Sequence, residues 1–251
     1  MQGSSISEAA KCRLEKLCAK AVPLVPENMR DKWLHYLKTH LDNYISVLSR
    51  LAPPESCGKL LEVGCVPGHL TLLLADLGYN ISCVDIDPNR ISSLLSAHSI
   101  KVHKVDIETE RLPFEDGSFS VVLFTEILEH LRVHPIFALR EVARVTKTGG
   151  KIILSVPNIT PRHRWKFFTG RDYQGDIVEA FEQLENVGHM GHVRLYSARE
   201  IQRILMYVGY TDLKFSREGR VKGSIFWQLF FPWRDYFRGV LYCVATKRRR
   251  V

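Results

Sequence analysis

Glu62 and Asp85 each end an apolar run of this chain, and a glycine-containing turn lies between them. The turn extends from Gly64 to Gly68, and an apolar helical stretch follows it. Such a turn brings backbone N–H groups and a helix N-terminus close to a small ligand. An acid about twenty residues further on can bind the two hydroxyls of a ribose. This arrangement indicates an adenosine-containing cofactor.

A second group of ionisable residues, Glu126, Glu129 and His130, follows an apolar run at 119–124. In one interpretation the three side chains bind a divalent cation, because carboxylates suit Mg²⁺ and an imidazole shifts the preference towards Zn²⁺ or Mn²⁺. Such an ion lowers the pKa of a hydroxyl acceptor. In the other interpretation no metal binds, Glu126 lines the cofactor site, and Glu129 and His130 serve structure or proton transfer. The sequence favours the second interpretation.

Two histidines, His189 and His192, lie in a glycine-rich segment at 188–196. An imidazole titrates near neutral pH, so either histidine could deprotonate an acceptor hydroxyl. Either could also complete a metal site with His130, or cap backbone groups in a glycine hinge. Of the two, His192 is the preferred candidate.

Alternating strands and helices are expected to position these residues. Apolar runs predict strands near 59–63, 81–85, 101–105, 119–124 and 150–156, with helices at 68–77, 88–97 and 134–146. Asp87 is expected to cap the second of these helices. Gly149 and Gly150 predict a turn before the fifth strand. Strands near 211–217 and 240–246 would complete the sheet as an antiparallel hairpin with a long connection, after a helix that begins with the capping box at 197–200. The pattern predicts an α/β fold with a Rossmann-like, doubly wound, mostly parallel seven-stranded sheet.

The chain divides into two parts by its patterning. Residues 1–54 are expected to form an N-terminal helical cap, because two helical patterns fill 7–50 and a Pro-Pro pair follows at 53–54. Residues 55–251 would form the cofactor domain. Within it, the irregular segment 158–192 is expected to act as a lid or acceptor wall, since a long irregular insertion is often functional.

Composition and cysteine pattern indicate which class of protein and which compartment to expect. Apolar content is 45%, charged content is 25% and the net charge is +8. No run is long and apolar enough to span a bilayer, and the polar N-terminus is unlike a signal peptide. Six cysteines without a C-x-x-C pair indicate reduced thiols, so a cytoplasmic protein is expected. The aromatic segment 225–238 is either a peripheral membrane contact or a hydrophobic cover over the sheet, and the cover is favoured.

The order of five motifs resembles that of class I S-adenosylmethionine-dependent methyltransferases over roughly residues 55–215. The motifs, in chain order, are 62–68, 84–87, 105–107 with 112–114, 119–131 and 149–158. The most similar subgroup includes ubiquinone-type O-methyltransferases and methyltransferases that act on cell-surface glycans. The resemblance implies methyl transfer to a hydroxyl of a small, lipid-linked or glycan-linked acceptor, with help from Glu129, His130 or His192. No RNA-binding module is visible, so a nucleic-acid partner is not expected.

The resemblance also implies roles in binding S-adenosylmethionine. The residues expected at its methionine end and sulfonium are Glu62, Gly64, Gly68, Thr125 and Glu126. Those expected at its ribose and adenine are Asp85, Ile86, Asp106 and Ile107. Certain relatives, including some ubiquinone O-methyltransferases, bind a divalent ion through an E-x-x-E-H pattern like that at 126–130.

One position departs from the family's pattern of three alternate glycines, because Val66 replaces the middle glycine. A β-branched residue disfavours a positive φ. Three explanations remain open: a turn that accommodates valine, weakened cofactor binding, or a non-catalytic binding subunit; the first is favoured. An RNA 2′-O-methyltransferase and a nicotinamide-dependent oxidoreductase are weaker alternatives. The latter expects G-x-G-x-x-G, whose second and third glycines are Val66 and His69 here.

Overall fold

A seven-stranded sheet lies at the centre of the computed structural model, which describes residues 2–159, 161–170, 178, 181–182, 191–221 and 238–248. The strands are β1 (Leu60–Val63), β2 (Ile81–Asp85), β3 (Val102–Lys104), β4 (Phe119–Thr125), β5 (Thr146–Pro157), β6 (Tyr210–Val221) and β7 (Arg238–Lys247). Their order across the sheet is β3-β2-β1-β4-β5-β7-β6. The first five strands run parallel, and β7 pairs antiparallel with both β5 and β6. This is the predicted doubly wound sheet with its terminal hairpin.

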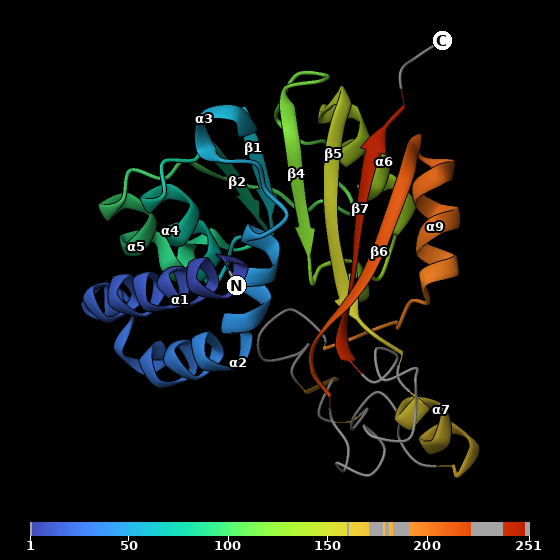
Figure 1. Cartoon of the computed structure of the whole chain (residues 1–251), viewed down its shortest axis with the longest axis horizontal. Helices are drawn as coiled ribbons and strands as arrows, with labels where there is room; N and C mark the ends of the chain where they lie inside the picture. Colours follow the sequence, from blue (N-terminus) through green and yellow to red (C-terminus); the bar gives the residue numbers. More distant parts are fainter. Residues whose placement is uncertain are drawn as a thin grey trace.

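Helices cover both faces of the sheet (Figure 1). The α-helices are α1 (Gln2–Ala21), α2 (Arg30–Leu48), α3 (Pro54–Cys57), α4 (His69–Asp76), α5 (Ser92–Ala97), α6 (Pro135–Val145), α7 (Pro161–Phe168) and α9 (Ala198–Tyr207). Short 3₁₀ turns span Val22–Leu24, Glu27–Met29, Pro88–Ile91 and Leu128–His130. Helices α4 and α5 lie on the same side as α1 and α2, whereas α6 and α9 lie on the other side. No helix of the described residues is both long and apolar enough to cross a membrane.

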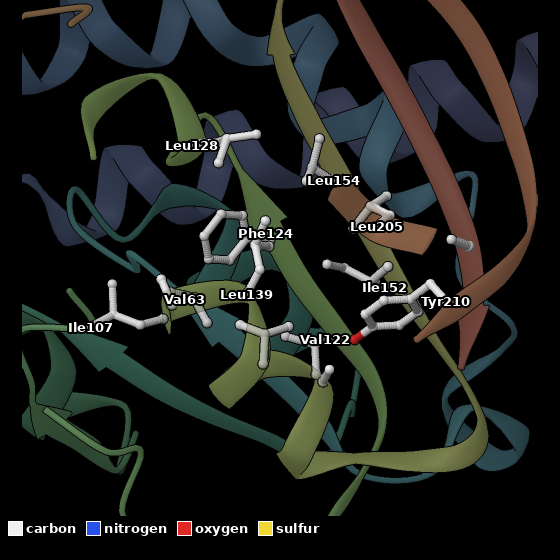
Figure 2. Packing of buried hydrophobic residues seen from close by; sticks show 14 of the residues in the cluster. Val63, Ile107, Val122, Phe124, Leu128, Leu139, Ile152, Leu154, Leu205 and Tyr210 are labelled. Carbon is white, nitrogen blue, oxygen red and sulfur yellow. The ribbon is translucent and has the colours of Figure 1, made fainter. Parts of the chain in front are cut away.

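Strand β4 is apolar along its length because both of its faces are covered. Its alternate residues Val122 and Phe124 point into the cluster formed with α6 and α9, which Figure 2 shows from close by. Val121 and Leu123 belong to the cluster on the opposite face. The core therefore fixes β4 between two helical layers, and its polar end residue Thr125 emerges at the carboxyl edge of the sheet.

The N-terminal helices share a core with α4 and α5. Leu14 and Trp33 are buried together with Leu72 and Leu73 of α4. The Trp33 indole Nε1–H also donates to the carbonyl oxygen of Pro67 at 2.8 Å. Burial of these apolar side chains holds α1 and α2 directly over the glycine turn.

Local signals for helix and strand ends were partly right. The capping box at Ser197 and Glu200 is confirmed, with the side chain of each residue bonded to the backbone of the other. Asp87 occupies the N-cap position before Pro88, as predicted, but its side chain makes no cap hydrogen bond, and the segment begins as a 3₁₀ turn. The predicted turn before the fifth strand was wrong. Strand β5 begins earlier, and Gly149 with φ +78° lies in an irregular stretch inside it.

Several sequence predictions fall wholly or mainly outside the described residues. These are the lid role of 158–192, His189 and the aromatic segment 225–238, of which only the last residue is described. The end of the insertion, from Gly191 onward, is described and contributes to the site below.

Candidate active site

The turn after β1 has the backbone geometry that its glycines permit. Gly64 has φ +77° and Gly68 has φ +92°, both in the left-handed region. A Cβ on Gly64 would lie 2.1 Å from the Cδ1 atom of Ile127. The Gly64 N–H donates to the carbonyl oxygen of Val84 at 2.8 Å, which joins the turn to β2. The positive φ of residue 64 and the position of the Ile127 side chain beside it therefore both favour glycine here.

Val66 is accommodated without a positive φ, since it is not among the described non-glycine residues with that conformation. Its N–H donates to Asp85 Oδ2 at 3.0 Å. Its side chain packs against the core that the cap helices form with α4 and α5. The valine thus joins the cofactor turn to the cap, which a glycine could not do through a side chain.

We expect Val66→Gly to destabilise the protein without increasing its affinity for S-adenosylmethionine. The variant loses apolar contacts with the cap and gains backbone freedom in the unfolded chain, at a cost of about 1–2 kcal/mol. Thermal unfolding and calorimetric titration of the wild type and the variant measure the two effects. A tenfold gain in affinity would instead mean that Val66 obstructs the cofactor.

Two adjoining hollows lie at the carboxyl ends of the parallel strands, and Gly64 and Ile127 line both. The first, here called the β2 hollow, is lined by side chains that include Asp85, Ile86 and Asp106. The second, here called the cap hollow, lies between β1, β4 and helix α2. The empty space in them, including the part that is continuous with bulk solvent, is about 700 and 560 Å³. Ligands of doubly wound folds bind at this edge, where the strand order reverses beside β1.

Asp85 is the most constrained acid of the β2 hollow. Its Oδ2 accepts from Val66 N–H at 3.0 Å, and its Oδ1 accepts from Asp87 N–H at 2.9 Å. Burial raises the pKa of Asp85, although these two N–H groups and Arg90 oppose the rise. Asp106 accepts from the Glu108 N–H at 3.0 Å. Both carboxyls are therefore oriented by backbone groups at the hollow in which ribose and adenine were expected.

The apolar residues expected near the adenine also line the β2 hollow. Ile86 is 51% exposed, which is unusual for a large aliphatic side chain, whereas Ile107 is buried. An exposed aliphatic side chain beside two oriented carboxyls suits a flat ring that carries polar edges.

Glu62 is the buried acid of the cap hollow. It accepts from the Thr71 hydroxyl at 2.8 Å. Burial raises the pKa of Glu62 to about 8, the Thr71 hydrogen bond opposes that rise, and the charge of Asp85 adds to it. A carboxyl with this pKa is largely protonated in the ligand-free protein at neutral pH. A cationic group placed beside it would favour its ionised form.

The stability of the ligand-free protein should therefore depend on pH through Glu62. Its folded-state pKa of about 8 lies above the ordinary value of 4.5, so the folded state binds more protons than the unfolded state between these limits. Stability then falls as pH rises through this window, at a slope of up to about 1.4 kcal/mol per pH unit. Thermal unfolding from pH 5 to pH 8.5 should show a smaller decline for Glu62→Gln than for wild type. The exposed Glu55→Gln serves as control, and equal declines in all three proteins would contradict the assignment.

Glu126 and Glu129 follow β4 in an unusual backbone turn. Glu126 has φ +54°, and its Oε1 accepts from the Ser155 hydroxyl at 2.8 Å. Glu126 and Thr125 line the cap hollow. Glu129 lies beneath the surface, and burial together with the negative charge of Glu126 raises its pKa. Among the described residues neither oxygen of its carboxyl has a hydrogen-bond partner.

His130 lines the β2 hollow, and His192 lies against it although the two are far apart in the sequence. Their ring centroids lie 5.1 Å apart. The end of the insertion is held here because the Val193 N–H donates to the Glu129 carbonyl oxygen at 2.8 Å. His130 Nδ1 lies 3.0 Å from the carbonyl oxygen of Gly191. A carbonyl only accepts, so Nδ1 carries the proton and Nε2 of neutral His130 carries the lone pair.

His192 is poorly suited to take a proton. The His192 residue is exposed, but partial desolvation of its imidazole, with the charges of His130 and His163, lowers its pKa to about 4. A base this weak is unprotonated at neutral pH but accepts a proton from a hydroxyl inefficiently. The geometry therefore favours His130 over His192 as the proton acceptor.

The same cluster fits a divalent cation. Glu129, His130 and His192 each offer one ligand atom, and these atoms lie within 4.8 Å of one another. A buried carboxyl without a hydrogen-bond partner and an imidazole oriented by a carbonyl are features of metal sites. Glu126, which the sequence analysis gave as a possible third ligand with Glu129 and His130, instead accepts a hydrogen bond from the Ser155 hydroxyl.

Sequence reasoning missed the contribution of helix α2. Tyr36, His40, Asn43 and Tyr44 line the cap hollow, opposite the turn that carries His69. The aromatic residues among them recur every four positions, which places them on one face of the helix. The His40 ring stacks on Tyr36 at 3.8 Å, which orders this wall of the hollow.

Comparisons with known proteins agree with this geometry. Residues 33–214 match the family described as "Methyltransferase domain". The chain is 29% identical over 167 residues to a Mycobacterium tuberculosis protein named "Probable S-adenosylmethionine-dependent methyltransferase", an alignment that covers 66% of this chain and 54% of that protein. It is 30% identical to a "Ubiquinone biosynthesis O-methyltransferase" of Xanthomonas campestris, over 63% of this chain and 66% of that enzyme. The chain thus spans about half to two thirds of these curated relatives.

Solved structures share the fold. A SAM-dependent methyltransferase from Archaeoglobus fulgidus has a TM-score of 0.57 at 17% identity, with 85% of this chain and 94% of that chain covered. Phosphoethanolamine N-methyltransferase 2 from Haemonchus contortus, in complex with S-adenosyl-L-methionine, has a TM-score of 0.56 at 16% identity, with 83% of this chain and 53% of that chain covered.

Proposed function

Because this chain belongs to the methyltransferase domain family, we propose that it transfers the methyl group of S-adenosylmethionine to a hydroxyl of a small, lipid-linked or glycan-linked acceptor. The observation that carries the proposal is the pair of hollows joined at Gly64, with oriented acids in each. The β2 hollow suits adenosine through Asp85 and Asp106. The cap hollow suits a cationic group beside Glu62 and Glu126.

The chemistry requires few protein groups. The acceptor oxygen attacks the methyl carbon, the bond from carbon to sulfur breaks, and S-adenosylhomocysteine leaves. The sulfonium is already a good leaving group, so proximity and alignment supply much of the rate. The hydroxyl proton passes to Nε2 of His130, whose ring is oriented by the Gly191 carbonyl. His192 lies edge-on against the ring of His130, with the ring centroids 5.1 Å apart.

A divalent cation is a second way in which the same cluster could act. Glu129, His130 and His192 would hold it, and the bound ion would lower the pKa of the acceptor hydroxyl as a Lewis acid. Calorimetric titration with Mn²⁺ and Zn²⁺ separates the alternatives. Micromolar binding that His192→Ala abolishes would favour the metal site, and no binding would favour His130 acting alone.

Titration of S-adenosylmethionine into the wild-type chain tests whether the protein binds the proposed cofactor. Two results together would support the proposed methyltransferase activity. The wild type would bind S-adenosylmethionine with micromolar affinity, and it would transfer a labelled methyl group to phenolic or sugar hydroxyls. His130→Ala would prevent this transfer. Absence of binding would support the alternative of a non-catalytic binding subunit. Transfer to the 2′-hydroxyl of RNA would favour the nucleic-acid alternative, and binding of a nicotinamide cofactor the oxidoreductase. We also propose that the protein is cytoplasmic and that segment 225–238 makes a peripheral membrane contact.

A further inference from the structure

We propose that the hydroxyl of Ser155 holds the Glu126 carboxylate beside the sulfonium of S-adenosylmethionine. Ser155 is then a positioning residue through which the site distinguishes this cofactor from its uncharged product, S-adenosylhomocysteine. The proposal rests on the proposed function, since it concerns that cofactor and that product. Ser155 lies near the end of β5 and has no part in the mechanism described so far.

Two hydrogen bonds join Glu126 to Ser155. The Ser155 hydroxyl donates to Glu126 Oε1 at 2.8 Å, and the Glu126 backbone N–H donates to the Ser155 carbonyl oxygen at 3.0 Å. The second bond continues the strand pairing, in which Thr125 of β4 lies opposite Ser155 of β5. Glu126 has φ +54°, a conformation that a residue with a side chain keeps only where its surroundings hold it. The two bonds to Ser155 supply that support.

Glu126 lies beside the junction of the two hollows. The next residue, Ile127, lines both hollows, and Glu126 and Ser155 line the cap hollow. In S-adenosylmethionine the sulfur joins adenosine to the amino-acid chain. With adenosine beside Asp85 in the β2 hollow, the sulfur is expected where the two hollows meet, next to the Glu126 carboxyl.

The Ser155 hydroxyl favours the charged form of Glu126. Ser155 is buried and Glu126 is partly buried. Desolvation raises the pKa of Glu126, and the hydrogen bond from Ser155 opposes that rise. A hydrogen bond donated to a carboxylate stabilises the charged form more than the neutral acid. Without the hydroxyl, a cation bound beside Glu126 would meet a carboxyl that is harder to ionise and less fixed in direction.

Methyl transfer removes the positive charge from the sulfur. The electron pair of the broken carbon–sulfur bond stays on the sulfur, so S-adenosylhomocysteine carries an uncharged thioether at the same place. A carboxylate attracts a sulfonium by its charge but has no such attraction for a thioether. Glu126, held by Ser155, therefore stabilises bound cofactor more than bound product, and this difference favours the exchange of product for new cofactor.

Calorimetric titration of the two ligands measures this preference. We expect Ser155→Ala to weaken binding of S-adenosylmethionine about tenfold, as for loss of a hydrogen bond to a charged group, and to change binding of S-adenosylhomocysteine by less than about twofold. Ser155→Thr retains a hydroxyl and should retain the preference. Thr146→Val is a matched control, because it removes another buried hydroxyl of β5, which bonds to Val142 and Tyr210. This control should lower the unfolding temperature and leave both affinities unchanged.

A double-mutant cycle tests whether Ser155 acts through Glu126. Glu126→Gln removes the charge and is expected to reduce the preference for S-adenosylmethionine over S-adenosylhomocysteine. Addition of Ser155→Ala to this variant should reduce the preference no further. An undiminished effect of Ser155→Ala in the Glu126→Gln background would overturn the proposal, because Ser155 would then act without the carboxylate.

The outcomes separate this proposal from the proposed function. If the wild type binds neither ligand, the proposed function fails. If the wild type binds both and Ser155→Ala weakens both equally, the serine supports the shape of the site and the proposal is overturned. If Ser155→Ala changes neither affinity, the hydroxyl does not help Glu126 to bind the cofactor, and the proposal is likewise overturned.

Discussion

Asp85→Asn is expected to lower the affinity of the chain for S-adenosylmethionine by about 100-fold or more. The carboxylate is expected to accept from the ribose hydroxyls, and a hydrogen bond to a charged group contributes about 1.5–3 kcal/mol. The same oxygens accept from the N–H groups of Val66 and Asp87. An amide NH₂ turned towards either N–H would place donor against donor, so the cofactor turn would shift as well.

Calorimetry with S-adenosylmethionine and with S-adenosylhomocysteine measures this loss. Asp87→Asn is a matched control, because it removes the same charge two residues away, where only the backbone N–H is used. Retention of wild-type affinity in Asp85→Asn would exclude Asp85 as a cofactor ligand. An equal loss in both variants would point to net charge rather than to a specific contact.

Gly64→Ala is expected to abolish cofactor binding and to destabilise the fold by more than the cost of its backbone conformation alone. An alanine at φ +77° carries a strain of about 1–2 kcal/mol. Its Cβ would also lie 2.1 Å from Ile127 Cδ1 and 3.1 Å from Ile127 Cγ1, so the Ile127 side chain would have to shift. This shift would change both hollows, since Ile127 lines each of them.

Gly78→Ala provides the comparison for that variant. Gly78 has φ +87°, but no atom lies within 4 Å of its Cβ position. The stability loss of Gly78→Ala therefore measures the cost of the backbone strain without a steric clash of the new Cβ. Thermal unfolding should show a larger loss for Gly64→Ala than for Gly78→Ala, and only the former should lose the cofactor. Equal destabilisation of the two variants would mean that Ile127 moves aside at no cost.

The order of elements could be predicted from the sequence for a physical reason. Buried parallel strands such as β4 need apolar residues on both faces, and the helices between them need an apolar stripe, so each leaves a distinct pattern. Acids at the ends of β1 and β2 could also be predicted to lie near each other, because the carboxyl ends of parallel strands meet at one edge. Strand ends were less well predicted where a glycine lies inside an irregular strand, as at Gly149.

The sequence by itself determined the fold, the acids at the ends of β1 and β2 and the glycine turn, since these depend on local pattern and strand direction. Only the tertiary structure brought His192 to His130, 62 positions away in the sequence. Only the tertiary structure placed Tyr36 and Asn43 over the cap hollow and turned Val66 towards the cap. These contacts depend on how the cap and the insertion pack against the sheet, and packing between distant segments leaves no periodic signal in the chain.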